Sequence, residues 1–415
     1  MSRERAERAV ADAHRREWGL VLAATARVAG DLDVAEECVQ DAYVSALGAW
    51  TSDGVPRKPG AWLTATARRK ALDVLRRDKV FRARMPMLVG EEPEAEEDHD
   101  VPDDRLRLIF TCCHPALARE ARIALTLRLV CGVSTGDVAR AFLVSETTMA
   151  ARVTRAKKKI TAARIPYRVP EAAELPERLG AVLDVVHLLF TTGHTAPTGT
   201  DLVRADLVDR ALHLARTLRD LMPDEPEVRG LLGLLLLTDA RRATRTDADG
   251  RLLTLEEQDR SLWDPAMIAE GRAVVLDAFL GMPGRAGRYA LQAAIASLHA
   301  LAPSFGETDW RQIVALYDEL LTVWPTPVVA LNRAVALFHG DRPEHALAEM
   351  ARLRADGRLA GYHYLPAVHA DLLRRLGRTD EAADAYREAL ALAGNDAERE
   401  YLSRRLAQTT PPARP

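Results

Sequence analysis

The chain has 415 residues, a formal net charge of −3 and only four cysteines. This length suits about two or three domains, and sparse cysteines argue against a disulfide framework. The longest apolar run, residues 231–237, is far shorter than the ~20 residues that a membrane span needs, and the first residues lack the apolar core of a signal peptide. We therefore expect a soluble cytoplasmic protein. Ala, Leu and Arg are abundant and β-branched alternation is rare, which predicts an all-α fold.

The charge is distributed unevenly along the chain. Residues 62–84 contain eight Lys and Arg against two acids, and residues 147–169 contain seven and no acid. Local basic patches of this kind indicate a polyanionic partner, although the overall pI near 6.4 does not. Two basic modules on one tether suit a protein that contacts DNA at two spaced places.

Composition divides the chain into four parts. We expect a helical domain over residues 10–84, a linker over 85–104, a second helical domain over 105–165 and a long helical region over 171–410. Residues 91–104 of the linker are too acidic and too poor in apolar side chains to pack. The linker is then a solvated spacer, or it shields the basic faces when DNA is absent.

Two helices are predicted in the first domain. The helix over residues 33–50 presents Glu37, Gln40, Asp41 and Val44 along one stripe. The helix over residues 62–77 places its apolar side chains on one face and its polar ones on the other. The apolar face consists of Leu63, Ala67, Ala71 and Val74. The polar face consists of Thr66, Arg69, Lys70, Asp73, Arg76 and Arg77. Taken alone, this polar face is more typical of an ordinary solvated helix than of a DNA-binding one.

Residues 132–160 have the pattern of a helix-turn-helix. Ser134 caps the first helix with Asp137 three residues on, Leu143 and Val144 form the turn, and Ser145 caps the second helix. The second helix has an apolar stripe of Met149, Val153, Ala156 and Ile160. Its outer side chains include Thr147, Thr148, Arg152, Arg155 and Lys158. This layout is typical of a recognition helix that reads bases near its N-terminus, and the alternative is a helical hairpin with a charged outer face.

The third region contains a repeat near its end. Ala346 and Ala382 lie 36 residues apart within similar stretches, close to the ~34-residue period of tetratricopeptide repeats. Small Ala side chains stand where paired helices must approach closely. We expect a helical array of this type.

Other groups of residues in the sequence give weaker evidence for a metal site or a catalytic site. Cys112, Cys113, His114 and Cys131 lack the spacing of a zinc site and read as a small-residue core. Residues 245–256 match most of the pattern of a calcium-binding loop. Arg245, however, stands where a carboxylate is required, so an Asp-Gly turn is the better interpretation. Phosphate-binding glycine loops and nucleophile motifs are missing, and we expect neither an enzyme, a metal nor a cofactor.

Together these segments resemble known transcription proteins. Residues 33–77 look like region 2 of bacterial sigma factors, and residues 132–160 resemble region 4 of the extracytoplasmic-function class. Region 2, a linker and region 4 with no region 3 between them are the minimal layout of that class. Residues 190–197 and several Asp-rich segments up to residue 264 resemble the C-terminal extension of a sigma subgroup with a tetratricopeptide-like domain. One departure is FTTGH at residues 190–194, where that subgroup more usually has FNEGY.

The resemblance implies partners and residue roles. It implies that core RNA polymerase binds the stripe of Glu36, Glu37, Gln40 and Asp41, and that promoter DNA binds two surfaces. The −10 element would meet Arg69, Lys70, Asp73, Arg76 and Arg77, with residues 51–60 helping to capture an unstacked base. The −35 element would meet Thr147, Thr148, Arg152, Arg155 and Lys158.

Other interpretations stay open from the sequence. One alternative is a stand-alone helix-turn-helix regulator with a repeat-type adaptor domain, and another is a scaffold whose repeats bind peptides. Within the sigma interpretation, the C-terminal region holds the sigma regions inactive, replaces an inhibitory partner, or binds a helper protein in a concave groove.

Overall fold

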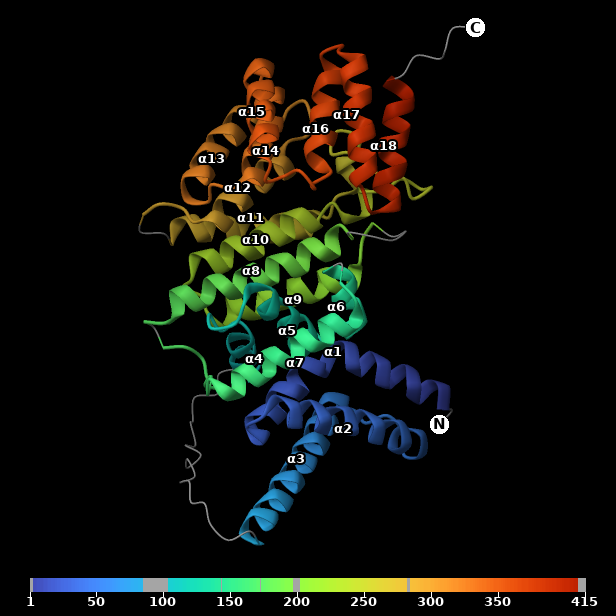
Figure 1. Ribbon diagram of the computed structural model, residues 1–415, viewed down its shortest axis with the longest axis vertical. Helices are drawn as coiled ribbons and strands as arrows, with labels where there is room; N and C mark the ends of the chain where they lie inside the picture. Colours follow the sequence, from blue (N-terminus) through green and yellow to red (C-terminus); the bar gives the residue numbers. More distant parts are fainter. Residues whose placement is uncertain are drawn as a thin grey trace. The chain divides into compact units, whose positions relative to one another are not determined.

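A computed structural model describes residues 3–84, 104–142, 144–171, 173–196, 202–281 and 284–409. Apart from one isolated antiparallel bridge between Thr246 and Leu252, the regular structure of these residues is helical, which confirms the all-α prediction (Figure 1). The chain forms two compact units, Met1–Val185 and Val186–Pro415. Most of the acidic linker and Leu143 of the expected turn lie outside the described residues. None of the helices that the structure describes is long and apolar enough to span a membrane.

Unit 1 begins with three mutually packed helices, α1 (Arg3–Ala29), α2 (Leu32–Ser52) and α3 (Pro59–Arg84). The turn into α2 uses Gly30 at φ +67°, and the Asp31 carboxylate then caps α2 by accepting the backbone N–H groups of residues 33 and 34. Trp50 of α2 is almost fully buried and meets Trp62 of α3 edge to face, with ring centroids 5.8 Å apart. This packing fixes the direction in which α3 leaves the bundle.

A second group of short helices follows in unit 1. It comprises α4 (Asp104–Cys112), α5 (Arg119–Leu125), the π-helix η1 (Thr126–Val130), α6 (Thr135–Ala141) and α7 (Glu146–Ala162). The predicted caps are confirmed. The Ser134 hydroxyl accepts the N–H of Asp137 at 3.1 Å and donates to its carboxylate at 2.7 Å, and Ser145 accepts the N–H of Thr148 at 3.2 Å. Because both caps form, α6 and α7 begin where a helix-turn-helix requires.

The two groups of unit 1 pack against each other through α1 and η1. The Trp18 indole N–H donates to the carbonyl of Leu129 at 3.1 Å. A Cβ on Gly19 would lie 2.3 Å from the carbonyl oxygen of Val130, and one on Gly132, at φ +63°, would lie 2.9 Å from the Trp18 ring. Glycine at both positions therefore permits a backbone approach that any larger residue would prevent.

Unit 2 is a succession of helical pairs. α8 (Leu175–His194) runs across the division between the units, and the helices that follow lie in unit 2. They are α9 (Ala205–Leu221), α10 (Pro226–Asp239), α11 (Pro265–Leu280), α12 (Arg288–Leu301), α13 (Trp310–Val323), α14 (Pro327–His339), α15 (Pro343–Asp356), α16 (Tyr364–Arg375), α17 (Thr379–Leu392) and α18 (Asp396–Thr409). Single-turn 3-10 helices occur at η2 (Arg242–Thr244) and η3 (Arg260–Leu262).

The predicted repeat is present in the last helices. α15 and α17 begin 36 residues apart, and each packs against the helix before it, α14 and α16 respectively (Figure 1). Ala346 and Ala382 are fully buried at equivalent places in these two hairpins. The small side chain allows the paired helices to approach closely, as the sequence predicted.

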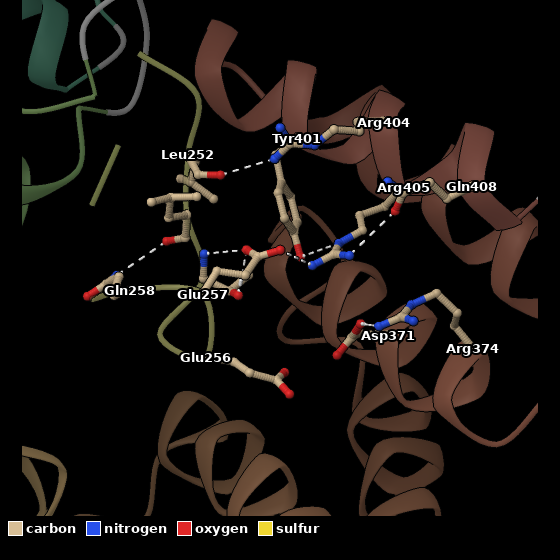
Figure 2. A network of polar contacts seen from close by, with 12 residues as sticks. Leu252, Glu256, Glu257, Gln258, Asp371, Arg374, Tyr401, Arg404, Arg405 and Gln408 are labelled. Carbon is tan, nitrogen blue, oxygen red and sulfur yellow. Dashed lines mark hydrogen bonds and ion pairs between the residues drawn. The ribbon is translucent and has the colours of Figure 1, made fainter. Parts of the chain in front are cut away.

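The segment between α10 and α11 lies against the C-terminal helices of unit 2. Arg405 of α18 binds Glu257 with an N–O distance of 2.9 Å, and Arg404 donates to the carbonyl of Leu252 at 3.2 Å (Figure 2). Arg375 of α16 pairs with Glu256. Upstream, the Asp247 carboxylate accepts backbone N–H groups around Gly250, so residues 245–256 form the predicted Asp-Gly turn.

Candidate nucleic-acid interface

α3 presents the first basic surface. Leu63, Ala67 and Ala71 are fully buried against the bundle, and Val74 is half-buried. The opposite face carries the polar residues predicted from the sequence. Arg69, Asp73, Arg76 and Arg77 are exposed, and Thr66 and Lys70 are half-buried. The structure thus gathers all six on the side of α3 that does not pack.

The cations of this face have only weak partners. Arg76 lies 3.8 Å from the carboxylate of Asp73, and Lys70 lies 3.6 Å from that of Asp41 on α2. Arg77 donates to the Asp73 carbonyl at 3.2 Å. Exposed ion pairs of this kind contribute about 0–1 kcal/mol, so phosphate oxygens can replace these partners at little cost.

α7 presents the second surface. Met149, Val153, Ala156 and Ile160 form its buried stripe, as predicted. The candidate base-reading residues lie on the other side. Thr147, Thr148, Arg155 and Lys158 are exposed, and Arg152 is half-buried. An exposed helix with threonines at its N-terminus and cations further on provides short hydroxyl donors, bidentate forks and a favourable dipole for DNA.

Two local contacts orient these side chains. The guanidinium of Arg152 lies over the Phe142 ring, 5.7 Å from its centroid. The hydroxyls of Thr147 and Thr148 lie 3.0 and 2.8 Å from that of Ser145, which also caps the helix. Ser145 therefore holds both the start of α7 and the side chains of Thr147 and Thr148. This limits the orientations in which the two threonines can contact a base.

α2 carries the stripe of acidic and apolar side chains. Glu37, Gln40, Asp41 and Val44 are exposed, with Val44 accessible to 67%. The stripe therefore leaves two carboxylates, one amide and one apolar side chain open to solvent along one face of α2. This stripe lies on a helix different from those of the two basic faces.

Glu36 borders that stripe, where the Gln40 amide donates to its carboxylate at 3.5 Å, but Glu36 is buried. Its carboxylate binds Lys157 of α7, with an N–O distance of 2.5 Å, and also pairs with Arg128 of η1. Lys157 lies 2.8 Å from Asp33 as well. Burial acts to lower the pKa of Lys157, but its hydrogen bonds to Asp33 and Glu36 outweigh burial and raise it. A charged, buried ion cluster therefore joins the helix of the predicted polymerase stripe to the predicted recognition helix.

The sequence interpretation did not single out Lys157 or Arg128. One signal was present: Lys157 stands beside Ala156 and between Val153 and Ile160, at a core-facing position of an amphipathic helix. A cation at such a position needs a buried acid, because an unpaired charge in a core is strongly unfavourable. The partner is 121 residues away in sequence, so only the tertiary structure identifies it.

The cysteines take no part in these surfaces. All four are buried, and burial raises the pKa of Cys113 to about 11 and that of Cys112 well above its ordinary value. Both thiols are then protonated at neutral pH and make poor metal ligands. Throughout the described part of the chain, no group of three His, Cys, Asp or Glu side chains is arranged to hold a metal ion.

Comparison with known proteins agrees with this geometry. Residues 6–80 match the family model for sigma-70 region 2, and residues 107–160 match that for sigma-70 region 4. Residues 178–279 match a family of unknown function, DUF6596. An uncharacterised protein of Rhizobium meliloti (strain 1021) is 43% identical over 393 residues, which cover 93% of this chain and 92% of that protein. The chain belongs to the sigma-70 family of RNA polymerase sigma factors, as a member of the extracytoplasmic-function type with a C-terminal extension.

Proposed function

We propose that this protein binds core RNA polymerase and directs initiation by placing α3 on the −10 element and α7 on the −35 element of its promoters. The observation that carries the proposal is the pair of exposed basic faces on two helices that match sigma regions 2 and 4. Catalysis stays with the polymerase, and this chain supplies recognition and assists melting. The proposed −10 contacts are Arg69, Lys70, Asp73, Arg76 and Arg77.

The remaining contacts follow from exposure and chemistry. We assign the −35 element to Thr147, Thr148, Arg152, Arg155 and Lys158, because they form the open side of α7. We assign the polymerase surface to Glu37, Gln40 and Asp41 on α2, flanked by Val44. A stand-alone regulator with the same helix-turn-helix gives no reason for an acidic stripe and a second basic helix in one bundle.

The observed packing of unit 1 cannot bind both elements at once. The contacts Lys157–Glu36 and Asp41–Lys70 connect α7 to α3 through α2. Helix rise and side-chain lengths along this path place Arg155 within about 45 Å of Arg69. The two promoter elements lie roughly 25 base pairs apart, which corresponds to about 85 Å of duplex. The ion cluster must therefore separate before both elements are engaged.

We infer that the packed form is the inactive, polymerase-free form. Separation of the cluster exposes Glu36 next to Glu37, Gln40 and Asp41, which completes the four-residue polymerase surface. Core polymerase then stabilises the open form by binding a surface that the packed form hides in part. On this proposal the chain binds promoters only after it has joined the polymerase.

The C-terminal domain regulates this step in our proposal. Residues 252–257 already cover one face of α16 and α18 in the same unit. A helper that bound there must displace this segment and its ion pairs. The C-terminal domain inhibits transcription initiation if it favours the packed form of unit 1. It is required for initiation if it favours the open form.

Run-off transcription on a genomic promoter library tests the proposal. Core polymerase is supplied with the full chain, with residues 1–185, or with the full chain carrying Glu37→Lys and Asp41→Lys. We expect specific transcripts with the full chain and none with the charge-reversed variant. Higher activity of residues 1–185 identifies the C-terminal domain as a brake, and loss of activity identifies it as required. Absence of any specific transcript with the full chain contradicts the sigma assignment.

A further inference from the structure

A cavity of about 440 Å³ lies inside unit 2, beside the segment that follows α10. Its walls are mainly apolar and aromatic, with contributions from Leu234, Leu237, Ile295, Trp263 and Trp324. This volume is in the range of about 300–1,000 Å³ that is usual for small-molecule sites. The cavity joins the family of unknown function to the helical repeats, because its lining comes from both.

One cation lines this cavity without a counter-charge. Among the described residues, no carboxylate lines the cavity and none forms an ion pair with Arg241. Burial, together with the neighbouring Arg245 and Arg260, lowers the pKa of Arg241 to about 10, so the group is still charged at neutral pH. Neither neighbour lines the cavity; Arg260, for example, donates to the carbonyls of His299 and Ala302 at 2.5 and 2.7 Å.

Two further polar atoms of the lining residues lack partners. Within the described part of the chain, the buried Nε1 of Trp263 and the buried Nδ1 of His299 have no hydrogen-bond partner. Burial, with Arg241 and Arg260 beside it, lowers the pKa of His299 to about 4, so its ring is neutral and can donate from one nitrogen. Both atoms are closed to solvent, so the accessible polar group of this wall is the Arg241 guanidinium.

We propose that this cavity binds a small organic carboxylate with an aromatic or aliphatic body. The carboxylate accepts the bidentate fork of Arg241, and the body packs on the apolar walls. One uncompensated arginine matches a monoanion. A phosphate dianion needs a second cation, and Arg245 and Arg260 do not reach the cavity. The proposal does not depend on the transcriptional role of the protein.

Thermal unfolding of the full chain with defined probes tests the site. The probes are phenylacetate and hexanoate at 10 mM, each compared with its neutral primary amide at the same concentration. Binding well above its Kd raises the Tm by about 2–5 °C for a unit of this size. We expect that rise with the carboxylates only, together with a change in tryptophan emission, since Trp263 and Trp324 line the cavity. Equal responses to acid and amide, or no response to either acid, overturn the proposal.

Two variants locate the binding. Arg241→Met should weaken carboxylate binding at least tenfold and raise the Tm of the unliganded protein, because it removes an uncompensated buried charge. Arg352→Met is the matched control, since that side chain is 72% exposed and is not among the residues that line the cavity. Arg241→Lys keeps the charge and removes only the bidentate fork, so a loss of about threefold is expected even if Arg241→Met does not fold. Unchanged carboxylate affinity in both folded variants contradicts the assignment.

Discussion

Replacement of Lys157 by methionine tests whether the ion cluster of unit 1 holds the protein in its packed form. Lys157→Met keeps the length and apolar stem of the side chain but removes the charge that contacts Glu36 and Asp33 at 2.5 and 2.8 Å. Removing one partner of a buried ion pair typically costs about 3–5 kcal/mol. The cost is lower here, because Glu36 keeps Arg128 and the Asp33 side chain is 62% exposed. We expect about 2–3 kcal/mol.

The loss of these ion pairs destabilises the packed form alone. In the open form residue 157 lies in solvent, so its replacement leaves the open form almost unchanged. The equilibrium between packed and open forms then shifts toward the open form by roughly 30- to 150-fold. If core polymerase binds only the open form, the apparent Kd for core falls by up to the same factor.

The assay is a fluorescence titration of labelled core polymerase with the full chain. Lys159→Met is the matched control, because Lys159 is exposed on the same helix and carries the same charge. We expect Lys157→Met to bind core at least tenfold more tightly than the control. Since the pKa of Lys157 is raised, the pair loses its contribution only above pH ~10.5, and the difference should be constant from pH 6 to 9. Equal affinities for the two variants refute the inference that packing competes with polymerase binding.

Three further predictions concern single surfaces. Charge reversal by Glu37→Lys and Asp41→Lys should abolish co-purification with core polymerase while leaving the far-ultraviolet circular dichroism unchanged; retained co-purification contradicts the assignment of the stripe. Arg155→Ala should weaken promoter binding of the holoenzyme by about 1–3 kcal/mol if Arg155 reads a base, and an equal loss on promoters with a scrambled −35 element reassigns it to phosphate. Burial lowers the pKa of His194 to about 2 and that of His299 to about 4, below the ~6.5 of the unfolded chain. The unfolded state therefore binds more protons below pH 6.5, and stability should fall toward pH 4 by up to about 1.4 kcal/mol per pH unit for each histidine; urea midpoints independent of pH between 7 and 5 contradict this.

The local features of the fold were predictable because their causes are local. Ser134 and Ser145 cap their helices through residues three positions on, and the apolar stripe of α7 follows from the helical period. The repeat was visible because small side chains recur where helices pair, as Ala346 and Ala382 do. In each case the interacting residues lie on the same or adjacent helices.

The contacts between distant segments were not predictable. Glu36 was expected on the polymerase surface, and the structure places it in an ion cluster with Lys157 and Arg128 instead of on the exposed stripe. The helical period gave one signal, because Glu36 stands four residues after Leu32 and three before Val39, on the buried face of its helix. The identity of its partners gave no such signal. Arg241 likewise stands among other arginines, and its lack of a counter-charge becomes apparent only when the helices assemble around the cavity. Pairing across a core depends on topology, which local periodicity does not encode.

Permanganate mapping of unpaired thymines on a promoter selected by run-off transcription tests the central claim most directly. The full chain alone, core polymerase alone and the two together are compared on the same DNA. The sigma account predicts reactive thymines around the −10 element only when both proteins are present, and loss of that reactivity with Glu37→Lys and Asp41→Lys. Specific promoter binding by the chain alone, with no core-dependent melting, contradicts the account and indicates a stand-alone regulator.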